Sequence, residues 1–171
     1  MKKLQFLKAI VDFIWIMSLL FFPFLVALSI YFIFTNEIID IPVKITFSEV
    51  DLTNPMGKIA LLIALLIALL NYIILLVALF YFRKLMTNFR KRLIFEDVNQ
   101  ILFDKIGTII IASSVVYLLT DFLANTSVSK VKIDFGYGPF LYLLGLGLFF
   151  KVLAEVFKMG KSLKEENELT I

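Results

Sequence analysis

The chain has 171 residues, of which 61% are hydrophobic, and its mean hydropathy is +0.96. Soluble domains contain about 45–50% apolar residues, so a soluble globular fold of this size could not bury so much apolar surface. The absence of Cys and His excludes disulfides, thiolate nucleophiles and the usual zinc and copper sites, and the formal charge of +3 is modest. We expect neither an enzyme nor a cofactor, and no direct binding of nucleic acid.

Four apolar stretches are long enough to cross a bilayer as helices. They cover residues 13–34, 59–82, 106–124 and 139–157. At 1.5 Å per residue each extends about 30 Å, the thickness of the hydrocarbon core. The first is longer than the apolar part of a signal peptide, which predicts a retained span kinked at Pro23. The sequence therefore predicts an all-α integral membrane protein with a single four-helix transmembrane domain over residues 1–171.

Two of the connections between these stretches contain alternating apolar residues. The alternating positions are Ile41, Val43, Ile45 and Phe47 in the first connection, and Val131, Ile133 and Phe135 in the last. A period of two is typical of half-buried strands, so these segments can pair into a small extracytoplasmic β-sheet. Irregular loops are the alternative.

The connection 83–105 and the tail 158–171 both have helical patterns. Leu85, Phe89 and Leu93 recur at helical spacing among basic residues, so we expect the second helix to continue beyond the bilayer. Asp97 followed by Gln100 is typical of a capping box and predicts a new helix leading into the third span. The connection is thus a predicted helical elbow. The tail is typical of a solvated helix, but its apolar ending predicts contact with a partner or with the elbow.

Lysine and arginine residues are distributed unevenly along the chain. Thirteen of the 17 lie in the first eight residues, in residues 83–105, at Lys151 and in the tail. The positive-inside rule therefore predicts a multi-pass protein of the cell (inner) membrane with both termini and the elbow in the cytoplasm. The basic run 83–92 is explained by this topology and by attraction to anionic lipids; a docking surface for an acidic soluble partner is the functional alternative.

Three polar side chains within the predicted spans are candidate functional groups. Asn71 is predicted to donate or accept a hydrogen bond with Ser113 or Ser114 of the third span. Lys151 and Glu155 lie four residues apart on one helix face, which predicts an ion pair whose lysine reaches the membrane surface. These three side chains, together with Ser113 and Ser114, are the plausible lining of a transport path.

Residues 153–171, Leu-Ala-Glu-Val-Phe-Lys-Met-Gly-Lys-Ser-Leu-Lys-Glu-Glu-Asn-Glu-Leu-Thr-Ile, resemble the C-terminal signature of the YoaS-type small bacterial four-span membrane proteins, a domain family of unknown function. Phe95, Asn99, Ile106 and Gly107 are similar to a second motif of that family. A Gly-x-Pro often precedes the phenylalanine in such proteins, and this chain has Arg92-Leu93-Ile94 instead.

The resemblance implies a regulatory role. Members of this family are often encoded beside a small Cro/C1-type helix-turn-helix regulator, which implies that the membrane protein binds the regulator on its cytoplasmic side and withholds it from DNA. Transport of a small solute or ion is the alternative function, and a homodimer is a candidate assembly. The candidate partner-binding residues come from the elbow and the tail: Arg90, Lys91, Arg92, Phe95, Asn99, Glu165, Glu166, Leu169 and Ile171.

Overall fold

The computed structural model describes residues 2–35, 55–126 and 138–169. These residues form four α-helices and no strand: α1 (Lys2–Thr35), α2 (Pro55–Arg90), α3 (Asp97–Thr126) and α4 (Pro139–Leu169). Each helix is long and apolar enough to cross a membrane, so the chain is a multi-pass membrane protein. The residues of the predicted β-sheet, 41–47 and 131–135, lie outside the described ranges.

The helices extend beyond the apolar stretches that predicted them. α2 has 36 residues and is therefore about 54 Å long, well over the thickness of the hydrocarbon core. Its last turns take up residues 83–90, and α3 begins at Asp97, as the capping pattern predicted. Of the predicted elbow 83–105, residues 83–90 belong to α2 and residues 97–105 to α3, so that only residues 91–96 form a turn between the helices. α4 likewise continues from the apolar stretch to Leu169.

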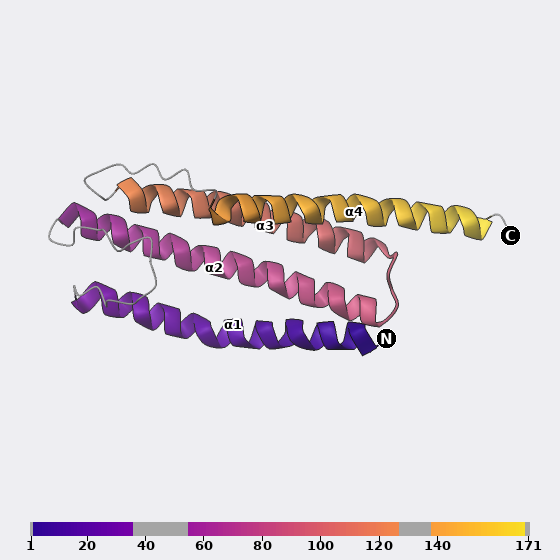
Figure 1. The fold of residues 1–171 in the computed structure, drawn as a ribbon, viewed down its shortest axis with the longest axis horizontal. Helices are drawn as coiled ribbons and strands as arrows, with labels where there is room; N and C mark the ends of the chain where they lie inside the picture. The colour runs from indigo at the N-terminus through magenta and orange to yellow at the C-terminus, as the bar shows by residue number, and fades with distance from the viewer. Residues whose placement is uncertain (1, 36–54, 127–137, 170–171) are drawn as a thin grey trace.

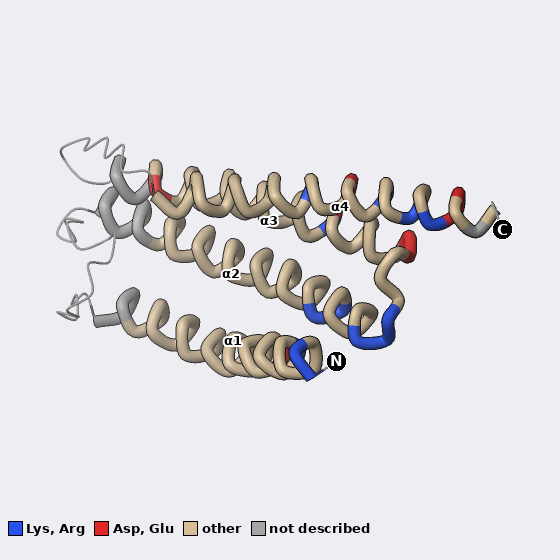
Figure 2. Tube along the Cα trace, turned by 45° about the vertical axis from the view of Figure 1, so that its right-hand side comes forward, with Lys and Arg blue, Asp and Glu red and all other residues tan. Residues whose placement is uncertain are grey.

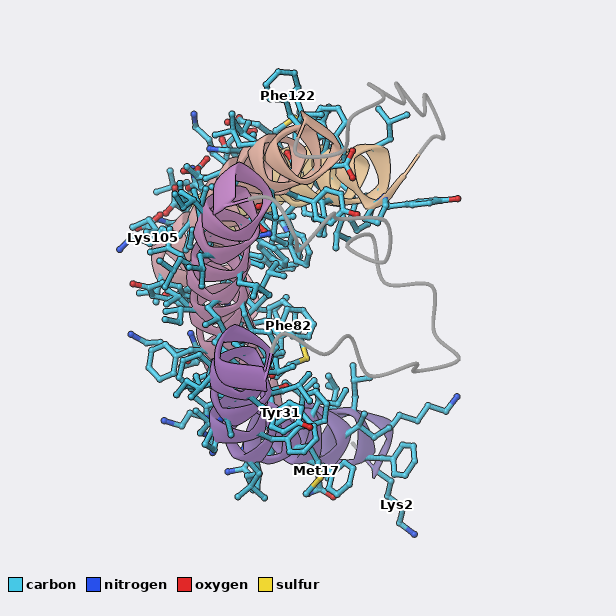
Figure 3. All side chains as sticks on the ribbon, turned by 90° about the vertical axis from the view of Figure 1, so that its left-hand side faces the viewer. Lys2, Met17, Tyr31, Phe82, Lys105 and Phe122 are labelled. Carbon is cyan, nitrogen blue, oxygen red and sulfur yellow. The ribbon has the colours of Figure 1, made fainter. Side chains whose placement is uncertain are left out.

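The helices form an open row in chain order. α1 packs on α2, α2 on α3, and α3 on α4. Viewed along the helices, the row curves into an arc with α1 and α4 at its ends (Figure 3). Phe82 points to the inner side of this arc and Lys105 to its outer side (Figure 3). Both termini and the α2–α3 turn lie at the same end of the molecule (Figure 1).

Two glycines allow α3 and α4 to approach each other closely. A Cβ atom on Gly107 would lie 2.8 Å from the carbonyl oxygen of Gly147, and one on Gly147 would lie 2.6 Å from Cγ1 of Ile111. The two backbones are therefore in contact, as small residues permit in membrane helices. Gly145, on another face of α4, has no atom within 4 Å of its Cβ position.

Among the helices that the structure describes, α1 packs on α2 alone. The Tyr72 hydroxyl donates a hydrogen bond of 2.8 Å to the carbonyl oxygen of Ser18, and the rings of Tyr72 and Phe22 stack. Pro23 lies within α1. All four helices contribute residues to one core, which includes Val11, Leu85, Leu102, Phe103, Ile106 and Ala154. This core lies toward the end of the molecule that contains the α2–α3 turn, so that end has the densest packing.

Candidate functional site

Charged residues gather at one end of the molecule, which we call the basic end. It comprises residues 2–12 of α1, residues 83–104 and residues 151–169 of α4. Figure 2 shows Lys and Arg concentrated at this end, whereas the middle of each helix is almost free of charged residues. The predicted partner-binding residues that the structure describes all belong to this end, so the packing of this end decides which of them a partner could reach.

The α2–α3 turn has the hydrogen bonds of a Schellman motif. The Leu93 amide donates to the carbonyl oxygen of Asn88 at 3.1 Å, and the Arg92 amide donates to that of Phe89 at 3.1 Å. Arg92 has φ = 63°, the left-handed conformation that usually belongs to glycine at this position. The turn therefore presents an exposed arginine at the cost of some backbone strain.

Asn99 holds this turn against the start of α3. Its side-chain amide nitrogen donates to the carbonyl oxygens of Leu93 and, at 2.8 Å, of Ile94. Its side-chain oxygen accepts a hydrogen bond of 2.9 Å from Asn88. Asn99 has no exposed surface, so it offers nothing for a partner to contact. The prediction that Asn99 binds a partner is replaced by a structural role: it satisfies two backbone carbonyls that the turn leaves without helical partners.

The tail part of α4 packs against the turn through aromatic rings. The Phe157 ring stacks on that of Phe89, with centroids 5.6 Å apart, and contacts Phe103 at 4.6 Å and Phe95 at 5.7 Å. One turn further along α4, a Cβ atom on Gly160 would lie 2.6 Å from the Phe95 ring. The absence of a side chain at Gly160 thus lets the Phe95 ring lie directly on α4.

An ion pair closes the same contact at its outer edge. Lys161 Nζ lies 2.6 Å from a carboxylate oxygen of Asp97, the first residue of α3, and 3.3 Å from one of Glu165. The hydrogen bond to Asp97 raises the pKa of Lys161, which lies beyond the predicted span. Lys161 therefore stays charged at neutral pH and connects the turn to the tail.

A second ionic group attaches α1 to the basic end. The Asp12 carboxylate accepts hydrogen bonds from Arg83 of α2 and, at 2.6 Å, from Lys8 of its own helix. These charges lie near the ends of two apolar stretches, where headgroups and water can reach them. Together with Tyr72, they fix the register of α1 on α2.

The intramembrane polar residues form contacts between helices. The Ser113 hydroxyl donates a hydrogen bond of 2.6 Å to the Asn71 side-chain oxygen, and both residues are buried. The predicted hydrogen bond between the second and third spans is therefore present. The Ser114 hydroxyl donates instead to the Ile111 carbonyl oxygen within α3.

Lys151 has a different partner from the one its spacing predicted. Its Nζ lies 2.6 Å from Asp104 of α3, whereas Glu155 lies 3.9 Å from Lys158. The expected pairing of Lys151 with Glu155 is thus corrected. Lys151 lies on the face of α4 next to α3, beside Gly107, while Glu155 is exposed.

A family model described as "Protein of unknown function (DUF2975)" matches residues 45–171. The chain belongs to the DUF2975 family. No curated protein and no solved structure matches it. The expected membership of a family of unknown function is therefore confirmed at this level. The match covers α2, the α2–α3 turn, α3 and α4, and so includes most of the basic end.

Within this DUF2975 chain the structure brings most of the predicted partner-binding residues to one end. Arg90, Lys91, Arg92 and Phe95 are exposed on and beside the turn, and Glu165, Glu166 and Leu169 are exposed on α4. Ile171 lies outside the described residues. Four further residues connect these two groups: Asp97, Phe157, Gly160 and Lys161. Sequence patterns did not identify them as connecting residues. A sequence signal existed for three of them, because Phe157, Gly160 and Lys161 lie in the C-terminal signature.

Proposed function

We propose that this protein is a non-enzymatic regulatory membrane protein that binds a soluble cytoplasmic partner at its basic end. The proposed orientation rests on the distribution of Lys and Arg, which favours both termini and the α2–α3 turn in the cytoplasm and the protein in the cell membrane. The likeness of residues 153–171 to YoaS-type proteins adds the proposed partner, a small helix-turn-helix transcription regulator of the Cro/C1 type.

One observation carries this proposal: the turn and the tail, far apart in the sequence, form a continuous surface. Phe95 lies on Gly160, and Asp97 is paired with Lys161. The position of the turn is further fixed by the buried side chain of Asn99. A surface built in this way has its shape before a partner arrives, which lowers the entropy lost on binding.

The exposed side chains of this surface supply both apolar and charged contacts. Leu93, Ile94 and Phe95 are each more than 40% exposed, and an apolar group of this kind can act as the anchor of an interface. Glu165 and Glu166 place negative charge on the neighbouring tail. A helix-turn-helix protein presents positive charge on its DNA-contacting side, so these carboxylates can take the place of DNA phosphates. Binding would then exclude DNA.

The proposal is tested by purifying the full-length protein from its native membrane in mild detergent and identifying what accompanies it by mass spectrometry. We expect a small helix-turn-helix protein in the preparation. A variant that lacks residues 165–171 should lose this protein, because it lacks the acidic tail but keeps Lys161 and the aromatic contacts. Recovery should also fall as the salt concentration rises, since screening weakens contacts between exposed charges.

A matched control changes charge elsewhere on the molecule. Gln5→Glu adds an exposed negative charge to α1 at the same end, keeps every Lys and Arg that favours the orientation, and should leave recovery unchanged. Equal recovery of the regulator with the truncated and the full-length chain would contradict the proposed surface. Absence of any soluble protein from the full-length preparation would contradict the regulatory role itself.

The alternative function, transport, finds less support in the geometry. Asn71 and Ser113 are buried and hydrogen-bonded to each other, and the Ser114 hydroxyl is hydrogen-bonded to the backbone of α3. Lys151 and Glu155, the other two candidate lining residues, have charged partners near the basic end. These five side chains do not form a polar path across the apolar middle of the helices. We therefore prefer the regulatory role.

A further inference from the structure

Three charged side chains meet where α1 and α2 reach the basic end: Lys8, Asp12 and Arg83, which we call the α1–α2 cluster. One Asp12 carboxylate oxygen accepts from Lys8 at 2.6 Å, and the other accepts from Nε of Arg83. Two cations share one carboxylate, so the cluster has a net charge of +1. The two Nη groups of Arg83 have no hydrogen-bond partner among the described residues, and this side chain is 38% exposed. The cluster therefore retains free donors for an anion.

The surroundings of the cluster are strongly positive. At the basic end, α1 and α2 carry six basic residues, and Asp12 is the single acidic residue of these two helices. The other acidic residues of the basic end belong to the turn, α3 and α4. An anion is therefore attracted to the α1–α2 side of the basic end rather than to the α3–α4 side. The six basic residues are Lys2, Lys3, Lys8, Arg83, Lys84 and Arg90.

The position of the cluster along the helices corresponds to the level of lipid headgroups. Asp12 directly precedes the apolar stretch 13–34, and Arg83 directly follows the stretch 59–82, so both helices place the cluster at the edge of the hydrocarbon core. One turn further inward, the ring of Trp15 lies 5.8 Å from that of Phe80. Tryptophan is enriched at this depth. The most apolar part of α1 is not buried by the other helices, so lipid chains can lie beside the cluster.

We propose that the α1–α2 cluster binds the phosphate of an anionic phospholipid. The two free Nη groups of Arg83 match two phosphate oxygens, a geometry that favours arginine at phosphate sites. The net charge of the cluster disfavours a zwitterionic headgroup, which brings its own cation, and favours an anionic one. Basic sites between membrane helices at this level suit acidic headgroups. Free phosphate has the same chemistry, but the exposed apolar surface of α1 favours a ligand that also has acyl chains.

The fluorescence of Trp15 reports on the lipid beside the cluster, because this is the only tryptophan of the chain. The purified full-length protein is placed in phosphatidylcholine vesicles that contain increasing amounts of brominated phosphatidylglycerol or of brominated phosphatidylcholine. The bromine atoms lie near the headgroup end of the acyl chains and quench tryptophan on contact. We expect phosphatidylglycerol to bind beside Trp15 about fivefold more strongly than phosphatidylcholine.

Three variants separate lipid binding from helix packing. Arg83→Gln removes the phosphate donors and the net charge of the cluster, so it should abolish the preference for phosphatidylglycerol. Arg90→Gln is the matched control: it makes the same change two turns further along α2, beyond the cluster, and should keep the preference. Asp12→Asn breaks the same ion pair but leaves both cations, so its preference should equal or exceed that of the parent chain.

Four results would overturn the proposal. The first is equal quenching of the parent chain by both brominated lipids. The second is a loss in Arg90→Gln as large as that in Arg83→Gln, which would assign the preference to surface charge in general. The third is a loss of the preference in Asp12→Asn, which would mean that the ion pair only holds the helices together. The fourth is displacement of the lipid by inorganic phosphate but not by chloride at equal ionic strength, which would assign the cluster to free phosphate. The measurement needs no soluble partner, so its outcome is independent of the regulatory role.

Discussion

At the scale of single residues, Asn99 is the side chain on which the α2–α3 turn depends most. It is fully buried, it donates to the Leu93 and Ile94 carbonyl oxygens, and it accepts from Asn88. Asn99→Asp keeps the shape of the side chain but replaces the donating nitrogen by an oxygen. We expect it to lower the free energy of unfolding by about 3 kcal/mol at neutral pH, because a buried carboxylate would then face two carbonyl oxygens.

Thermal unfolding in detergent, followed by circular dichroism, measures this effect. Asn167→Asp makes the same chemical change at an exposed position of α4 and should have little effect. The deficit of Asn99→Asp should shrink near about pH 4, since a protonated carboxyl can again donate a hydrogen bond. A melting temperature equal to that of the parent chain at neutral pH would show that Asn99 does not hold the turn.

Residue patterns predicted some contacts of the site and missed others for identifiable reasons. Asn71 and Ser113 were paired correctly because few polar groups occur at that depth, so each had few alternatives. The predicted partner of Lys151, Glu155, was wrong because spacing along one helix cannot reveal a carboxylate 47 residues away on a neighbouring helix. The burial of Asn99 was missed because the turn was expected within a longer elbow, and a polar residue there had no evident reason to be buried.

At the scale of elements, the contact between α3 and α4 depends on Gly107 and Gly147. In Gly107→Ala the new methyl group would lie 2.8 Å from the Gly147 carbonyl oxygen and 3.1 Å from the Lys151 amide nitrogen, both backbone atoms. The helices would have to separate, and overpacking of this kind costs about 1–3 kcal/mol. We expect Gly107→Ala to lower the thermal stability of the protein in detergent accordingly.

Gly145→Ala provides the matched control, because nothing lies within 4 Å of its Cβ position. It should leave stability unchanged or raise it by up to about 1 kcal/mol, since alanine favours a helix over glycine. If both alanine variants melted at the same temperature, the close approach of the two helices would not be what holds them together.

The sequence predicted that four membrane-spanning helices exist, but it predicted their lengths less accurately. The apolar stretches gave the four helices because hydropathy over about twenty residues is a strong signal. The elbow 83–105 and the tail 158–171 were predicted to be helical, yet how far α2, α3 and α4 would continue depended on contacts between helices. The packing of Phe157 on Phe89 and Phe103 is such a contact, and it joins residues that are more than fifty positions apart.

At the scale of the whole molecule, the arc of helices could not be predicted from the sequence. In a soluble protein the polar side of a helix shows which side faces water, but in a membrane the lipid-facing side is as apolar as the packed side. The stretches 13–34 and 59–82 are apolar on nearly every side, with Asn71 the strongly polar exception in the second. The order of the helices in the row, and the exposure of α1 and of the outer face of α4, therefore came only from the structure (Figure 3).

The orientation of the molecule in the membrane is the claim on which the proposed function depends, and cysteine labelling tests it most directly. Leu169→Cys at the basic end and Gly138→Cys at the start of α4 each introduce a single thiol into a chain that has none. A membrane-impermeant maleimide applied to intact cells should label Gly138→Cys, and should label Leu169→Cys only after the cells are opened. Labelling of Leu169→Cys in intact cells would place the basic end outside the cytoplasm and contradict a cytoplasmic partner.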